Sequence, residues 1–199
     1  MIDPEDLDKY SVLYKDFLHP NPNIYSEAVF LLRKEFRAEF MENLLANLKV
    51  EDLVIRRKSI LALGEYGEEI LSLIVPLYFK SSNNNLVKVS CLKTILKVTV
   101  KFNLNELNQD VMSVLDLAIK DSSPEIILSA ISLLRQLGKN GRDFLIKTCR
   151  DKDLLRAKAS ITALLEIKDQ TIEDFFDELL NDKSIDPMIK EDILRDRMT

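Results

Sequence analysis

The sequence predicts an all-α protein, folded as a right-handed α-solenoid of about five to six helix pairs. A helix-turn-helix unit recurs every 29 to 39 residues along the 199-residue chain. A small residue recurs at one place in the second helix of successive units. Four Gly, six Pro and no Trp provide little of the turn chemistry that a many-stranded β fold needs. We therefore expect residues 1–199 to form a single repeat domain.

The clearest unit lies within residues 40–64. Residues 40–48, Phe-Met-Glu-Asn-Leu-Leu-Ala-Asn-Leu, predict a short amphipathic helix. An acidic turn at 51–52 follows, and then a second helix whose apolar or small residues at 55, 59, 60, 62 and 63 form one broad stripe. Gly64 and Gly67 lower the cost of ending that helix.

The second helix of each unit follows a turn rich in Asn, Asp, Ser or Pro. The Asn, Asp and Ser side chains accept hydrogen bonds from the first N–H groups of a helix. The second helices are expected to start near Ile24, Ile55, Val87, Ile126, Leu155 and, in a weaker copy, Ile189. The longest interval contains an extended inter-repeat loop near residues 100–109.

Four residues into the first five of these helices stands a small side chain. The positions are Ala28, Ser59, Cys91, Ala130 and Ala159. Small side chains let two helices approach closely, so this recurrence predicts tight packing between neighbouring helices.

The composition excludes several classes of protein. Hydrophobic residues make up 46% of the chain, which is enough for a packed core and excludes wholesale disorder. One His and two Cys exclude a multi-His or Cys-cluster metal site. No apolar run approaches the roughly 18–20 residues of a membrane span, and residues 1–6 lack the basic start of a signal peptide. We expect a cytoplasmic protein with no metal and no membrane span.

The acidic balance belongs to the two ends of the chain. The formal net charge of −5 divides into −3 for residues 1–49, +4 for 50–160 and −6 for 161–199. Nucleic-acid binding needs a strongly basic footprint. The net charge and the acidic ends therefore argue against that class.

No catalytic residue is predicted. His19, the single imidazole, lies in a Pro/Asn-rich loop without a Cys or Ser partner nearby in sequence. Cys91 takes the small-residue position of its helix, Cys149 is expected to be half exposed, and a disulfide between them is not expected. The Gly64/Gly67 and Gly138/Gly141 pairs suit helix ends and lack the strand that precedes a phosphate-binding loop.

The strongest candidate site is a set of basic residues on the predicted second helices. Such helices line one face of a solenoid, so their basic side chains converge and attract anionic ligands or acidic partner surfaces. The candidates for contact with an anionic ligand or a partner are Arg57, Lys58, Lys88, Lys93, Lys97, Arg135 and Lys158. A simply solvated face is the alternative. For Arg56, Lys88, Arg156 and Lys190 the alternative is a bridge to turn acids such as Asp52 that holds neighbouring repeats in register.

Aromatic residues are dense in the first repeat. They are Tyr10, Tyr14, Phe17, Tyr25, Phe30, Phe36 and Phe40. We expect them to form the core of an end cap, although the polar tips of the three tyrosines also suit an interface.

Residues 52–67, Asp-Leu-Val-Ile-Arg-Arg-Lys-Ser-Ile-Leu-Ala-Leu-Gly-Glu-Tyr-Gly, resemble the HEAT-like repeat of the phycobilisome lyase family. Residues 19–24, 85–93, 123–126 and 186–191 look like its successive repeats. Among small members, the chain is most similar to the chaperone-like partners of the phycoerythrin bilin lyase. Later repeats depart from the pattern, with Leu96, Arg135 and Leu165 where the family has Gly.

The resemblance implies an accessory or chaperone-like protein that assists bilin attachment to phycobiliprotein, especially phycoerythrin, subunits. The implied partners are such a subunit and a bilin lyase. No cofactor would be firmly bound, and a linear tetrapyrrole such as phycoerythrobilin would be the transferred group. Because the family has no universal catalytic motif, we expect no catalysis by this chain alone. The alternative is a non-enzymatic scaffold that binds another protein in iron–sulfur assembly or phycobilisome turnover.

Overall fold

A computed structural model describes residues 6–167 and 169–196. In this part of the chain helix is the only regular secondary structure, which confirms the all-α class. The elements are α1 Leu7–Phe17, α2 Pro22–Glu35, α3 Arg37–Asn47, α4 Leu53–Leu63, the 3₁₀ helix η1 Gly64–Ile70, α5 Leu71–Lys80, α6 Asn85–Lys101, α7 Gln109–Ile119, α8 Pro124–Gln136, α9 Lys139–Thr148, α10 Leu154–Leu165, α11 Gln170–Asn181 and α12 Pro187–Asp196. None of the described helices combines the length and the apolar character that crossing a membrane requires.

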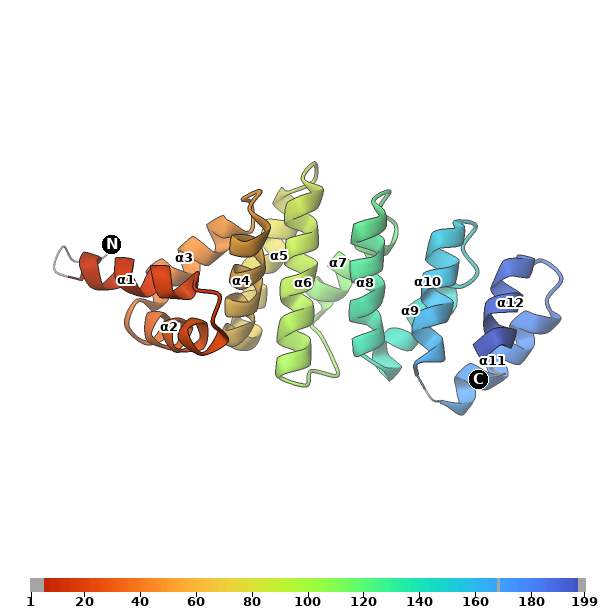
Figure 1. Ribbon diagram of the computed structural model, residues 1–199. Helices are drawn as coiled ribbons and strands as arrows, with labels where there is room; N and C mark the ends of the chain where they lie inside the picture. The colour runs from red at the N-terminus through yellow and green to blue at the C-terminus, as the bar shows by residue number, and fades with distance from the viewer. Residues whose placement is uncertain (1–5, 168, 197–199) are drawn as a thin grey trace. The chain divides into compact units, whose positions relative to one another are not determined.

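The helices cluster into two compact units, residues 1–101 and 102–199. In unit 1, α1 packs on α2, α3 on α4, and α5 on α6, while α4 and α6 also pack on each other (Figure 1). The core between them includes the fully buried Phe17, Phe40, Leu63 and Ile95. Each helix pair therefore buries its apolar stripe partly within itself and partly against the next pair.

Unit 2 repeats the same local arrangement. Helix α8 packs on α7, α9 and α10, and α10 packs on α9 and α12. Leu115, Leu134, Leu164 and Ile193 are completely buried in this core. Within the unit, α8, α10 and α12 form one layer and α7, α9 and α11 form the other (Figure 1).

The turns before the helices cap them, as their composition predicts. The Asp52 carboxylate accepts hydrogen bonds from Val54 N at 2.8 Å and Ile55 N at 3.0 Å. Side chains of Asn21, Asn84, Asn108 and Asp153 act in the same way at α2, α6, α7 and α10. Capping satisfies N–H groups that have no partner inside the helix.

The small residues pack as expected in four helices and one residue away from the expected place in the fifth. Ala28, Ser59, Cys91 and Ala130 are at most 2% exposed. Ala159 is only half-buried, and Ser160 is fully buried instead. The prediction for Ala159 was wrong because α10 begins at Leu154, which places Ser160 six residues beyond the first residue of the helix, as in the other four.

The aromatic residues of the first repeat form the expected core with one exception. Phe17 contacts Phe40 edge-to-face, with ring centroids 5.3 Å apart, and Tyr10 contacts Phe36 in the same way. Asn43 and Asn47 donate hydrogen bonds to the hydroxyls of Tyr10 and Tyr14. Phe30 is 62% exposed, so the prediction that it lies in the core was wrong.

Two glycines are required by close approach rather than by a turn. A Cβ atom on Gly141 would lie 1.9 Å from the carbonyl oxygen of Leu134, so no larger residue lets α9 approach α8 as it does. On Gly64 a Cβ would lie 2.7 Å from Cγ of Lys97, whose side chain lies across η1. A third glycine, Gly67, has φ 75° and ψ −157°, a conformation that residues with a Cβ rarely adopt.

We predict that Gly141→Ala lowers the free energy of unfolding by about 1–3 kcal/mol, because α9 must move away from the backbone of α8. Lys139→Ala, at an exposed position of the same helix, should change it by less than about 0.5 kcal/mol. Urea denaturation of both variants measures the difference. Equal midpoints for Gly141→Ala and the parent chain would contradict the packing described here.

Candidate functional site

The two units share the seven predicted site residues unequally. Arg57, Lys58, Lys88, Lys93 and Lys97 belong to unit 1, and Arg135 and Lys158 belong to unit 2. All seven lie on α4, α6, α8 or α10, as expected of second helices. Their environments divide them into side chains used inside the protein and side chains directed to solvent.

Lys58 holds α4 to the loop that precedes α2. Its Nζ donates a hydrogen bond to the carbonyl oxygen of His19 at 2.8 Å and lies 4.5 Å from the ring centroid of Tyr25. The Tyr25 hydroxyl in turn donates to the carbonyl oxygen of Lys58 at 3.2 Å. Burial lowers the pKa of the Lys58 ammonium. These contacts give Lys58 a structural role between neighbouring helix pairs.

Three more candidates contact other side chains of the protein. Nζ of Lys88 lies 5.8 Å from the ring centroid of Tyr78. Arg135 forms an ion pair with Glu166, and Nζ of Lys158 lies 3.0 Å from the Asp192 carboxylate. The Arg135 pair is exposed and borders a groove of about 430 Å³ between α8 and α10, lined also by Leu128 and Ala163.

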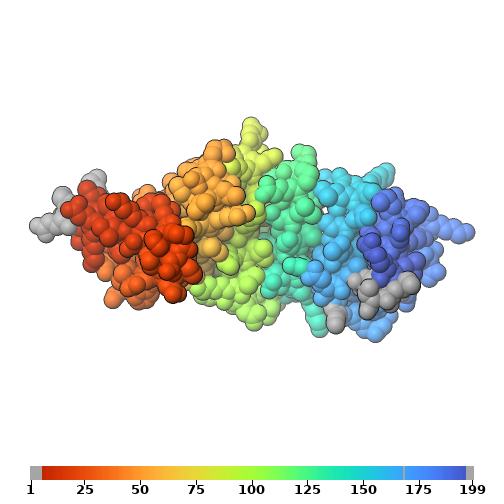
Figure 2. Space-filling model, in the orientation of Figure 1, coloured from red at the N-terminus to blue at the C-terminus, as the bar shows by residue number. Residues whose placement is uncertain are grey.

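The remaining three candidates, Arg57, Lys93 and Lys97, are exposed on α4 and α6. Among the described residues, Arg57 and Lys97 form no ion pair. Leu61, which is 40% exposed, follows Arg57 by one helical turn, as Lys97 follows Lys93, so each pair shares one side of its helix. We call Arg57, Leu61, Lys93 and Lys97 the α4–α6 face; its helices lie toward the viewer in Figure 2.

The cations expected to hold neighbouring repeats in register bind mainly backbone carbonyl groups. Arg56 donates to Val50 O at 2.6 Å and Lys190 to Leu180 O at 2.9 Å. Arg156 donates to Asp121 O in the preceding turn at 3.0 Å and to the Asp151 carboxylate at 3.4 Å. A bridge from Arg56 to Asp52 was the expected contact, and it is absent from the described residues because the Asp52 carboxylate caps α4.

Sequence reasoning missed a pocket of about 280 Å³ in unit 1. Its lining residues are Tyr25, Ser26, Val29, Phe30 and Arg33 of α2, Glu65 of η1 and Lys101 of α6. We call it the Arg33 pocket. The Glu65 carboxylate forms ion pairs with Lys101 and, at 3.6 Å, with Nη1 of Arg33. Three separate helical segments therefore supply the charged groups of the pocket. Each group lies in the last turn of a second helix or just beyond it, and this shared position in the repeat is the sequence signal that could have revealed the pocket.

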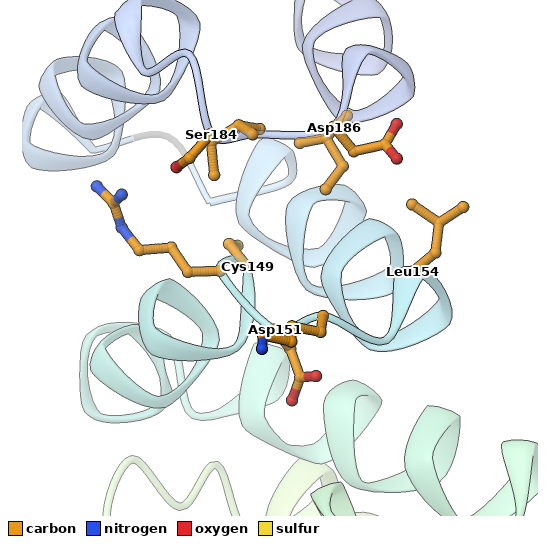
Figure 3. Close-up of a pocket in the computed structure, with 9 residues that line it drawn as sticks. Cys149, Asp151, Leu154, Ser184 and Asp186 are labelled. Carbon is orange, nitrogen blue, oxygen red and sulfur yellow. The ribbon is translucent and has the colours of Figure 1, made fainter.

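A second pocket, of about 370 Å³, lies between the turns that precede α10 and α12 (Figure 3). Cys149 and Asp151 come from the first turn, Leu154 is the first residue of α10, and Ser184 and Asp186 come from the second turn. The acids are occupied locally, because Asp151 accepts a hydrogen bond from Asp153 N and Asp186 from Met188 N, both at 2.8 Å. In Figure 3 the Asp151 carboxylate points away from Ser184 and Asp186. The polar groups of this pocket thus stabilise the turns.

The side chains that could act as a nucleophile or a general base, two cysteines and one histidine, are used in packing or within a turn. Cys91 and Cys149 are free thiols with no exposed surface, so the prediction that Cys149 is half exposed was wrong. Burial raises the pKa of the Cys91 thiol to about 12 and also raises the pKa of Cys149, which disfavours the reactive thiolate. Nδ1 of His19 accepts a hydrogen bond from Asn21 N within the turn. Within residues 6–167 and 169–196, no group of three or more His, Cys, Asp or Glu is arranged to hold a metal ion.

These features define an all-helical protein whose exposed polar surfaces suit binding. No family model matches the chain. It is 27% identical over 171 residues to the bilin biosynthesis protein CpeZ of Synechococcus sp. (strain WH8020), which covers 83% of this chain and 91% of that protein. It is also 22% identical over 179 residues to the uncharacterized phycocyanin operon protein Z of Pseudanabaena tenuis (strain PCC 7409). That match covers 89% of this chain and 88% of the relative. These relatives confirm the resemblance to the phycobilisome bilin-lyase-related proteins.

We predict that Lys58→Gln lowers the free energy of unfolding by about 1–2 kcal/mol, because it removes a charge-assisted hydrogen bond and a cation–π contact. Arg57→Gln, one residue away on the exposed side of α4, should change it by less than about 0.5 kcal/mol. Chemical denaturation of the two variants makes the comparison. Equal losses in both would show that Lys58 does not hold α4 in place.

Proposed function

We propose that this chain is a non-catalytic, chaperone-like accessory protein in the attachment of bilins to phycobiliprotein subunits, with phycoerythrin as the preferred target. One observation carries the proposal. The relative named as a bilin biosynthesis protein aligns over 91% of its own length and 83% of this chain. Similarity across nearly all of both chains favours a shared role over a shared repeat module.

The architecture supports a role in binding. We infer that the helix pairs within each unit are stacked as HEAT-like α-solenoid repeats, because a buried small residue recurs at the same position in α2, α4, α6, α8 and α10. Repeat arrays of this kind bind their partners through an extended face. A surface of this type holds a subunit without performing chemistry on it.

The α4–α6 face is the proposed contact surface for the phycobiliprotein subunit or its partner lyase. Three exposed cations, Arg57, Lys93 and Lys97, lie on two helices that pack together, with Leu61 beside Arg57. Such a face complements an acidic protein surface, and charge complementarity increases the association rate and excludes wrong partners. Lys58 is not part of this surface because its ammonium is used internally.

Co-expression with a phycoerythrin subunit, a bilin lyase and the bilin tests the function. With this chain present, we expect more soluble subunit and more covalently attached bilin, measured by absorbance and denaturing gel fluorescence. Unchanged solubility and attachment after its omission would falsify the proposal. Recovery of iron–sulfur or phycobilisome-turnover machinery without phycobiliprotein, in an affinity purification, would favour the scaffold function instead.

Charge reversal tests the contact surface. We predict that Arg57→Glu, Lys93→Glu and Lys97→Glu together weaken subunit or lyase binding about tenfold or more, measured by pull-down at low and moderate salt. The matched control reverses Lys15, Lys49 and Lys80, which are exposed elsewhere in unit 1. Both triple variants change the net charge equally. Equal loss of binding in the two would show that total charge, rather than the α4–α6 face, determines the interaction.

A further inference from the structure

The Arg33 pocket has a surplus of positive charge. Its lining contains two cations, Arg33 and Lys101, and one carboxylate, Glu65, which contacts both. The neighbouring ion pair between Arg37 and Glu69 is balanced and adds no net charge. A second carboxylate would therefore meet an unneutralised positive charge in the pocket.

The Arg33 guanidinium is fixed in place but incompletely bonded. Its Cζ lies over the Tyr66 ring, 4.9 Å from the ring centroid. Its contact with Glu65 spans 3.6 Å, and it forms no hydrogen bond within the described residues; its buried Nε also lacks a partner. Guanidinium groups bind carboxylates through paired N–H donors. Arg33 thus has donors available for a carboxylate that enters the pocket.

The pocket also has an aromatic wall. Phe30 is 62% exposed and precedes Arg33 by three residues, so the ring and the guanidinium lie on the same side of α2. Tyr25 and the nearly buried Val29 complete the apolar lining. An exposed phenyl ring beside a guanidinium with free hydrogen-bond donors suits a ligand with a flat conjugated body and a carboxylate attached to it.

We propose that the Arg33 pocket binds a ligand whose planar, conjugated body carries a carboxylate side chain, namely one inner pyrrole ring of an open-chain tetrapyrrole together with its propionate. Arg33 and Lys101 bind the propionate, and Phe30 packs against the adjacent pyrrole ring. Only the choice of tetrapyrrole rests on the proposed function; the requirement for a carboxylate and a flat ring comes from the pocket itself. Glu65 competes with the propionate for the same two cations.

Titration of the full chain with biliverdin and with biliverdin dimethyl ester tests the site. The two probes share the conjugated body, and only biliverdin carries free carboxylates. We expect absorbance titrations to show at least tenfold tighter binding of biliverdin than of the ester. Equal affinities, or no binding of biliverdin, would overturn the proposal.

Variants assign the binding to the pocket. Arg33→Gln should weaken biliverdin binding about 10- to 100-fold, which is the range for loss of a hydrogen bond to a charged group, and should leave the ester unaffected. Glu65→Gln should strengthen biliverdin binding several-fold, because the competing carboxylate is removed. Phe30→Ala should weaken binding of both probes. Circular dichroism and urea midpoints of each variant establish that it is folded.

Two matched controls lie outside the pocket. Arg37 also lies over the Tyr66 ring, at 5.0 Å, but is paired with Glu69, and Phe79 is 46% exposed on α5. Arg37→Gln and Phe79→Ala should leave both affinities unchanged. The assignment would be contradicted if Arg33→Gln still bound biliverdin more tightly than the ester, or if Arg37→Gln lost this preference.

The outcome separates this site from the proposed function. If biliverdin binding depends on Arg33 while co-expression shows no effect on bilin attachment, the site stands and the function falls. If the chain promotes attachment but biliverdin and its ester bind equally, the function stands and the site falls.

Discussion

Each helix pair of this protein buries its apolar side chains partly within itself and partly against a neighbouring pair, and close approach at small residues makes that packing possible. Ser59 and Cys91 are completely buried in unit 1, as Ala130 and Ser160 are in unit 2. Stability in such repeats comes from interfaces between neighbours as well as from each pair alone. Some polar groups at those interfaces are therefore engaged in contacts within the protein, whether or not a partner is bound.

This constraint determines which cations remain for binding. Lys58 and Arg156 extend to carbonyl groups in the turn before the preceding second helix, where they hold one pair against the next. Lys190 donates to the end of α11 and holds α12 within its own pair. In unit 1, Arg57 of α4 and Lys97 of α6 are exposed and form no ion pair within the described residues. The α4–α6 face and the Arg33 pocket both lie in unit 1, where helices α2, α4 and α6 provide most of their residues, so one unit carries both a proposed docking surface and a proposed ligand site.

The sequence predicts the helix pairs well because caps and small residues recur with the repeat. The start of each second helix was expected within two residues of its position in the structure. The prediction for Ala159 failed because two small residues, Ala159 and Ser160, are adjacent. The start of the helix was predicted one residue away from its position, so the wrong one of the two was chosen. Phe30 and Cys149 were misplaced because the exposure of each side chain depends on which neighbouring helices cover it, and that is not visible in the local sequence.

The candidate site was predictable only as a set of cations on the correct helices. Nothing in the local sequence distinguishes Arg57 from Lys58, because their difference arises from His19 and Tyr25, more than thirty residues away. The Arg33 pocket combines residues from positions 25 to 101 and has no local motif. Such sites become visible when the segments that contribute to them are placed together.

Zero-length cross-linking with a carbodiimide tests the central claim most directly, because it joins lysine amines only to carboxylates in direct contact. Applied to this chain with an apo-phycobiliprotein subunit and its lyase, it should produce intermolecular links at Lys93 and Lys97, identified by mass spectrometry. Links confined to Lys15, Lys49 or Lys80, or no links to either partner, would contradict the account.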